Sequence, residues 1–231
     1  MRIFLIILFG VGLLTAKTLH YEIDLWGIHV ADVEMETSDT LFENIPSKVI
    51  LFTTKTTPFT SKLFRVNNHY KTIVSKIDNR VLYFSKSTFQ PGVENKISTQ
   101  LIGGNICYTN SDICIPDSTF NIFSFLEYLC HFAEKGSQNK FLIEREGLLY
   151  NANYKCQNID NSTTLIELKM TQKNNVSQYQ VFEHTDIFTW AIFKENTTKN
   201  IWMNTELNEI LRCEFKSGLV RLTAKKTVKN E

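Results

Sequence analysis

The chain has 231 residues, of which 43% are hydrophobic and 12% aromatic. This composition can bury a core, and it excludes a disordered secreted stalk. The 25 basic and 24 acidic residues leave a net charge of +1, so no overall field exists to attract nucleic acid or an anionic membrane surface. Partners must therefore be recognised by local shape.

The first residues have the pattern of a cleavable signal peptide, residues 1–16. Arg2 supplies a short positive segment, Ile3 to Leu14 form an apolar one, and Ala16 is the small residue before the expected cleavage point. A retained anchor is the alternative, although the apolar run is shorter than the roughly 18 residues that span a bilayer. The first cysteine is Cys107, so no lipidation site follows the apolar run. We expect an exported protein, periplasmic or secreted, with no transmembrane segment in the mature chain.

Apolar and polar residues alternate from residue 17 onward, as at Tyr21, Ile23 and Leu25. Turn-forming residues interrupt this alternation about every ten residues, which is typical of an antiparallel sheet, sandwich or barrel. One of the later strands is expected over 186–194. The pattern predicts a single antiparallel β domain over 17–231.

Five cysteines lie in the part expected to be exported, where disulfides can form. Cys107 and Cys114 would stand opposite each other in a hairpin folded about Asn110 and Ser111, which makes them the disulfide candidate. Two buried free thiols are the alternative. Because neither a CxxC spacing nor a Cys/His cluster occurs, we expect no metal site.

A helical pattern interrupts the strands at 118–133, with Asp117 or Ser118 available as its N-cap. Glu127 and His131 stand one helical turn apart, and we expect a surface interaction between them instead of a catalytic or metal-binding pair. The apolar residues recur every three or four positions and should pack against the sheet. They are Ile122, Phe125, Leu126, Leu129 and Phe132.

The aromatic residues exceed what one flat sheet face needs. They either fill the space between sheet and helix or line a concave pocket for an acyl chain or another apolar ligand. The candidates for such a lining are Trp26, Phe64, Tyr83, Phe125, Trp190 and Trp202.

Three segments carry a family resemblance: YEIDLWGIHVADVEME, PDSTFNIFSFLEYL and NIWMNTELNEILRCEFKSGLVRLTAKK. In this order they resemble the opening strand, the helix and the closing hairpin of the bacterial envelope family called domain of unknown function 3108. Ala31 stands where that family usually has a glycine. The resemblance implies a curved antiparallel sheet around a helix, similar to the half-barrel of lipoprotein-carrier proteins, and a periplasmic location. It implies no catalytic residues.

These observations together predict a mainly β fold, a curved antiparallel sheet or half-barrel (sandwich-like) packed around one α-helix. The leading hypothesis is non-enzymatic binding of a hydrophobic, lipid-like ligand or envelope component; the alternatives are a scaffold that docks an envelope protein and a hydrolase with an unrecognised site. The sequence contains no nucleophile elbow, phosphate-binding loop or zinc-protease motif, so no catalytic residue, metal or cofactor is assigned. Glu144 and Glu146 are expected on the solvent face of a strand.

Overall fold

The computed structural model describes residues 16–133, 140–173, 181–182 and 184–228. The expected signal peptide, apart from Ala16, lies outside the described residues. The helices are η1 (Thr60–Lys62), α1 (Ile122–Phe132) and α2 (Ile187–Phe193). The strands are β1 (Lys17–Leu25), β2 (Ile28–Phe42), β3 (Ile45–Thr56), β4 (Asn67–Ser75), β5 (Val81–Gln90), β6 (Val93–Ile102), β7 (Asn105–Tyr108), β8 (Cys114–Pro116), β9 (Thr119–Phe120), β10 (Lys140–Arg145), β11 (Leu148–Asn158), β12 (Thr163–Gln172), β13 (Thr198–Asn204), β14 (Glu209–Ser217) and β15 (Val220–Thr227).

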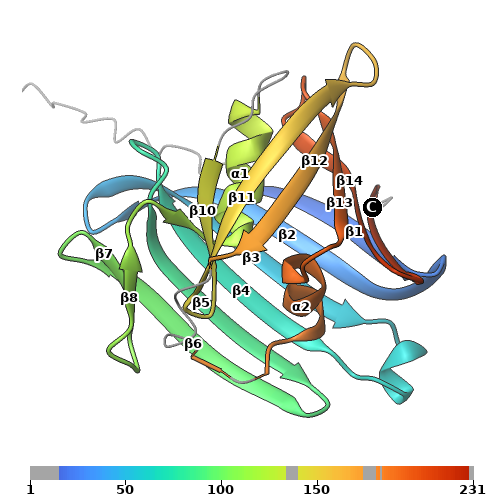
Figure 1. Ribbon diagram of the computed structural model, residues 1–231, viewed down its shortest axis with the longest axis horizontal. Coiled ribbons are helices and arrows are strands. Elements are labelled where there is room, and N and C mark those ends of the chain that lie inside the picture. Colours follow the sequence, from blue (N-terminus) through green and yellow to red (C-terminus); the bar gives the residue numbers. More distant parts are fainter. Residues whose placement is uncertain (1–15, 134–139, 174–180, 183, 229–231) are drawn as a thin grey trace, which may run out of the picture.

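The strands form one barrel-shaped sheet that is nearly closed and curves around α1 (Figure 1). Their order is β8-β7-β6-β5-β4-β3-β2-β1-β15-β14-β13-β12-β11-β10-β9. All neighbouring strands are antiparallel except β9 and β10, which run parallel. Because only Asp117 and Ser118 separate β8 from β9, the two ends of the sheet are joined by the chain itself. The predicted mainly β, curved antiparallel fold is confirmed.

Trp26 and Gly27 form the tight turn between β1 and β2, where the alternation changes phase. Their φ angles are 53° and 84°, in the left-handed region. Two-residue hairpin turns of this kind have a backbone twist that matches the twist of the strands they join. The turn normally carries Asn-Gly or Gly-Gly, so a tryptophan in its first position is unusual.

Helix α1 begins later than the sequence predicts. Asn121 is its N-cap, and a reciprocal pair of hydrogen bonds links the side chains and backbone of Asn121 and Ser124. The expected cap at Asp117 or Ser118 is wrong because the next two residues extend the sheet as β9. Asp117 instead accepts a hydrogen bond from Arg80, with Nη1 and Oδ2 2.9 Å apart.

Helix α2 stands where a strand was expected over 186–194, and that expectation is wrong. The Asp186 side chain accepts hydrogen bonds from the backbone N–H groups of Phe188 and Thr189, which caps the first turn. Of the seven residues in the helix only Phe193 is fully buried. The described residues therefore contain a second helix beside the one that was predicted.

The core lies inside the curved sheet, between the sheet and α1. On β11 the side chains of Tyr150, Ala152 and Tyr154 are buried, and the residues between them are exposed. The Phe125 ring of α1 packs at 5.2 Å from Phe141, whose ring lies 5.8 Å from that of Tyr154. Burying a large apolar side chain contributes about 1.5–3 kcal/mol to the stability of the fold. Packing against the sheet therefore holds α1 in place.

Candidate functional site

An apolar cavity of about 120 Å³ lies between the sheet and the two α-helices. Inward-facing residues of β1, β2, β3, β4, β14 and β15 form one wall, and α1 and α2 form the other. The volume approaches the roughly 150 Å³ of a known apolar cavity that stays dry and binds benzene. It is smaller than the roughly 300–1,000 Å³ of most small-molecule pockets. With α2 in place, the cavity has room for one small apolar group.

The two periodicities of the sequence place the lining. Ile23 and Met35 point inward because alternate residues of a strand share a face. Phe123 and Leu126 are three residues apart on α1 and therefore meet on one side of that helix. Ile192 of α2 covers part of the cavity. Among the described residues, the polar side-chain groups of the lining are the thiol of Cys213 and the hydroxyls of Tyr21, Thr54, Tyr70 and Thr189.

A buried ion cluster connects α2 to the sheet beside this cavity. Lys86 Nζ of β5 lies 2.5 Å from Glu146 Oε1 and 2.7 Å from Asp186 Oδ2, and all three side chains are at most 3% exposed. Thr185 donates a further hydrogen bond to Glu146 over 2.8 Å. Breaking such a buried pair by removing one partner costs about 3–5 kcal/mol, because an uncompensated charge is left behind. The cap residue of α2 is thus also its anchor.

Glu144 and Glu146 do not lie on the solvent face, which corrects the expectation from their spacing. Glu144 accepts a hydrogen bond of 2.6 Å from the Tyr108 hydroxyl. Burial raises the pKa of Glu144 to about 7, against the lowering effect of the hydrogen bonds from Tyr108 and from the Gly147 backbone. Tyr108 and Lys86, which are distant in sequence, stabilise Glu144 and Glu146 in the interior. The local spacing of the two glutamates does not indicate these partners.

One sequence signal could have revealed the ion cluster. Lys86 occupies an inward position on β5, between Phe84 and Thr88, which are also buried. A charged residue in the inward phase of a strand requires a buried partner of opposite charge. The sequence does not say which carboxylate provides it.

The six aromatic residues proposed as a cavity lining are dispersed, and none of them lines the apolar cavity. Phe125 is fully buried in the core. Trp26 and Trp190 are 63% and 44% exposed. Trp202 packs against the Arg212 guanidinium at 4.8 Å. Of the remaining two, Phe64 is half-buried in the β3–β4 loop and Tyr83 faces the outside of the sheet.

The disulfide candidate is joined in the structure, with the Sγ atoms of Cys107 and Cys114 2.02 Å apart. The two residues are direct partners in the β7–β8 hairpin. Cys130 and Cys213 are buried thiols, and burial raises the pKa of each to about 12. Such thiols are packing residues and poor nucleophiles.

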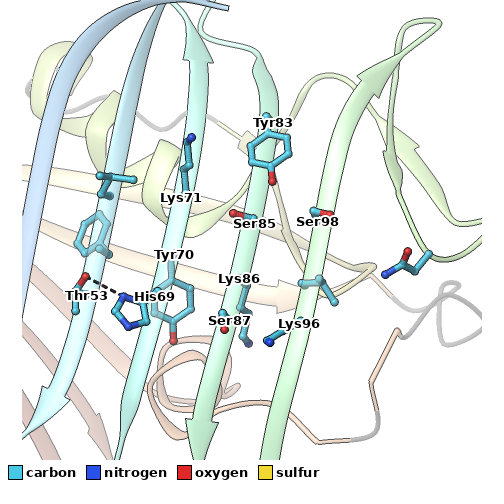
Figure 2. A pocket seen from close by; sticks show the side chains of 14 residues that line it. Thr53, His69, Tyr70, Lys71, Tyr83, Ser85, Lys86, Ser87, Lys96 and Ser98 are labelled. Carbon is cyan, nitrogen blue, oxygen red and sulfur yellow. Dashed lines mark hydrogen bonds between the residues drawn. The ribbon is translucent and has the colours of Figure 1, made fainter.

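Figure 2 shows a second hollow, a polar trough of about 440 Å³ on the outer face of β3, β4, β5 and β6. Lys71, Lys96 and His69 contribute its basic groups, and Thr53 Oγ1 lies 3.3 Å from His69 Nδ1. Between these basic groups lie the hydroxyl groups of Tyr83, Ser85, Ser87 and Ser98. The sequence alone does not reveal this trough because its residues come from separate strands.

Glu127 and His131 interact on α1, with Oε1 and Nε2 3.0 Å apart. The sheet adds a third group, since Lys48 Nζ of β3 lies 2.5 Å from the same oxygen. Burial raises the pKa of Glu127, but the hydrogen bonds from His131 and Lys48 outweigh it and the pKa is lowered. Glu127 is therefore a charged ion-pair partner, poorly suited to accept protons near neutral pH.

The described residues offer neither a metal site nor a membrane-spanning helix. No group of three or more His, Cys, Asp or Glu side chains in that part of the chain is placed to hold a metal ion. Neither α1 nor α2 is long and apolar enough to cross a membrane, and the same is true of η1.

Comparison of the sequence with protein-family models and with curated proteins finds no match. Among solved structures, the fold is similar to a β-barrel-like protein of domain of unknown function DUF1849 from Brucella abortus. The TM-score is 0.52 at 9% sequence identity, over 93% of this chain and 96% of that one. The likeness shows a shared barrel-like fold. It supports a barrel-like domain of unknown function and not the particular family that the three sequence segments resemble.

Proposed function

We propose that this chain is a non-enzymatic binding protein that holds the apolar part of a lipid-like ligand inside its barrel-like sheet. The observation that carries the proposal is the apolar cavity between α1, α2 and the sheet. The signal-peptide pattern and the Cys107–Cys114 disulfide support an exported, periplasmic setting for this activity, because disulfides persist in oxidising compartments.

Helix α2 is the part of the wall best suited to move. Its seven residues are too few for a helix to be stable alone, and it makes its charged contact at the N-terminal end, through Asp186. Ile192, in the last turn of the helix, covers the cavity together with Phe188 of the capped first turn. Displacing these two side chains would lengthen the cavity, and an acyl chain would gain about 0.8 kcal/mol for each methylene that it buries.

Native mass spectrometry of the protein purified from its own envelope tests the proposal. We expect a co-bound lipid mass in the wild-type protein. Leu126→Trp should fill the cavity and remove that mass, whereas Leu41→Trp, at a position 71% exposed on β2, should retain it. Thermal unfolding of both variants verifies that they are folded. A wild-type protein that carries no lipid, or equal lipid in the two variants, would contradict the proposal.

The outer trough favours a second candidate, a scaffold that docks an acidic segment of an envelope protein. Its volume of about 440 Å³ exceeds that of the internal cavity, and Lys71 and Lys96 give it a positive lining. Charge complementarity of this kind mainly supplies specificity and association rate.

Pull-down from the envelope separates the two candidates. A stoichiometric protein partner that is lost with the pair Lys71→Glu and Lys96→Glu would favour docking. The matched control reverses the exposed Lys155 and Lys169, on β11 and β12. Binding that survives both pairs, or is lost equally with both, would exclude the trough.

A further inference from the structure

We propose that one end of the barrel docks on an anionic lipid surface through an apolar rim. The rim consists of six exposed side chains on three hairpin tips, namely Trp26, Ile28, Phe59, Leu63, Leu219 and Val220. The inference goes beyond ligand binding, uses none of the residues that line the cavity, and does not require the cavity to hold a ligand.

The three tips are neighbours at one end of the sheet. They are the β1–β2 turn, the β3–β4 loop and the β14–β15 turn, and the strands β15, β1, β2 and β3 lie next to one another in that order (Figure 1). The Trp26 indole donates a hydrogen bond of 2.8 Å to the Leu219 carbonyl, and the Trp26 backbone N–H donates one of 3.2 Å to the Arg221 carbonyl. The Thr57 N–H in turn donates to the Val30 carbonyl over 3.0 Å. These bonds hold the tips together.

The exposure of the rim is large for a folded protein. Leu219 is 95% exposed, Leu63 83%, Phe59 74% and Trp26 63%. Single exposed apolar residues need no explanation, but several on adjoining tips indicate an interaction site.

The backbone of Trp26 is a second, independent observation. Its φ of 53° is unfavourable for a bulky side chain, and this turn position suits Asn or Gly. Strained backbone of this kind concentrates at functional sites. Here it presents an indole ring at the tip of a hairpin, and tryptophan is the residue enriched where membranes meet water.

The charged residues beside the rim favour an anionic lipid surface over other occupants. The β3–β4 loop carries Lys62 and Arg65 and no acidic residue, and neither cation forms an ion pair with another described residue. Near the β1–β2 turn, Asp24 pairs with Lys225 at 2.8 Å, and Asp32 Oδ1 lies 3.0 Å from His29 Nε2. Basic groups beside exposed apolar tips match anionic headgroups above an acyl layer.

The opposite end of the barrel provides the contrast. It also exposes apolar side chains, among them Leu41 and Leu207. Its turns, however, carry exposed carboxylates on Glu43, Asp160 and Glu206. These form no ion pair with another described residue, and an anionic surface would repel them. The two ends thus differ in charge more than in hydrophobicity.

Sedimentation with vesicles tests the rim. The full chain is mixed with vesicles of phosphatidylcholine alone and with vesicles that also contain phosphatidylglycerol. We expect binding to the second kind, weakened by salt because exposed charges are screened. The double variant Leu63→Ser and Leu219→Ser should bind at least about tenfold more weakly, a change of about 1.4 kcal/mol.

The control is the matched pair Leu41→Ser and Leu207→Ser at the opposite end, which should bind like the wild-type chain. The pair Lys62→Glu and Arg65→Glu should abolish the preference for phosphatidylglycerol. A wild-type chain that stays in the supernatant, or equal binding by the rim and control variants, would overturn the proposal. Sedimentation velocity without vesicles tests the alternative occupant, a second copy of the chain. A wild-type dimer that becomes a monomer in the rim variant would also overturn the proposal. Loss of vesicle binding leaves the co-bound lipid mass unaffected, so the two proposals fail separately.

Discussion

At the scale of single residues, the interior contains ionisable groups that most barrel-like sheets would exclude. Glu144 and Glu146 stand two positions apart, yet their surroundings differ. Glu146 forms an ion pair with Lys86, whereas the closest partner of Glu144 is the neutral Tyr108 hydroxyl. Burial therefore outweighs the hydrogen bonds that Glu144 accepts from Tyr108 and the Gly147 N–H, and the pKa of Glu144 rises.

Glu144→Gln should remove a pH dependence of stability. Below pH 4.5, the ordinary pKa, Glu144 is protonated in both states and burial costs no ionisation energy. As the pH rises from 4.5 to about 7, the unfolded chain releases this proton while the folded chain retains it, so the free energy of unfolding falls. Glutamine cannot titrate, so the free energy of unfolding of the variant should exceed that of the wild type above about pH 7.

Urea unfolding at a series of pH values measures this effect. The difference between Glu144→Gln and the wild type should grow steadily across the window, whereas Glu167→Gln, at an exposed position on β12, should run parallel to the wild type. A constant difference for Glu144→Gln would show that this carboxyl titrates as it does in the unfolded chain.

At the scale of elements, α2 shows how a capping residue can outweigh strand propensity. Its sequence IFTWAIF contains β-branched and aromatic residues that favour strands. The Asp186 side chain accepts two backbone hydrogen bonds, which require a helical first turn, and its ion pair with Lys86 fixes the start of the helix against the sheet. The local pattern is ambiguous, and the contact with β5 decides it.

Asp186→Asn separates the two roles of the cap. The amide keeps an acceptor oxygen for the backbone and loses the charge. Because Glu146 still pairs with Lys86, no buried charge is left without a partner, and we expect a loss of about 1.5–3 kcal/mol, the range for a hydrogen bond to a charged group. Asp186→Ala also loses the cap, which costs about 1 kcal/mol more. Equilibrium unfolding in urea gives both values, with the exposed Asp112→Asn as the control. If both substitutions at Asp186 behave like the control, the ion cluster does not anchor α2.

At the scale of the whole molecule, contacts distant in sequence close the barrel. β1 pairs with β15, so strands from the two ends of the described chain lie side by side. The edges of the sheet meet where β8 leads into β9. The Cys107–Cys114 disulfide ties β8, only three residues long, to β7 at this seam.

Replacing both Cys107 and Cys114 with serine should lower the free energy of unfolding. Closing a loop of this length restricts the unfolded chain, and the expected loss is about 2–3 kcal/mol. Adding a reducing agent to the wild-type protein should produce the same change and should not affect the double variant. Equal stability of the wild type with and without reductant would mean that the bond does not form in solution.

The sequence by itself determined the features that depend on neighbouring residues. Alternation along a strand, as at Tyr21 and Ile23, predicts β structure because it repeats the geometry of the pleat. The apolar spacing around Phe125 and Leu129 locates α1 within a few residues, and the hairpin spacing of Cys107 and Cys114 selects that pair. The signal-peptide pattern over residues 1–16 remains a prediction from sequence alone.

Only the tertiary structure decided which strands are neighbours, and therefore which side chains meet. Lys86, Glu146 and Asp186 are brought together by the closing of the sheet, and no spacing encodes such a contact. The same holds for the aromatic residues of the predicted lining that lie on strands, Tyr83 and Trp202, since alternation says that a residue faces one side of a strand and not which side encloses the cavity. Periodicity is a local property of the chain, whereas a binding site is assembled from residues far apart in sequence.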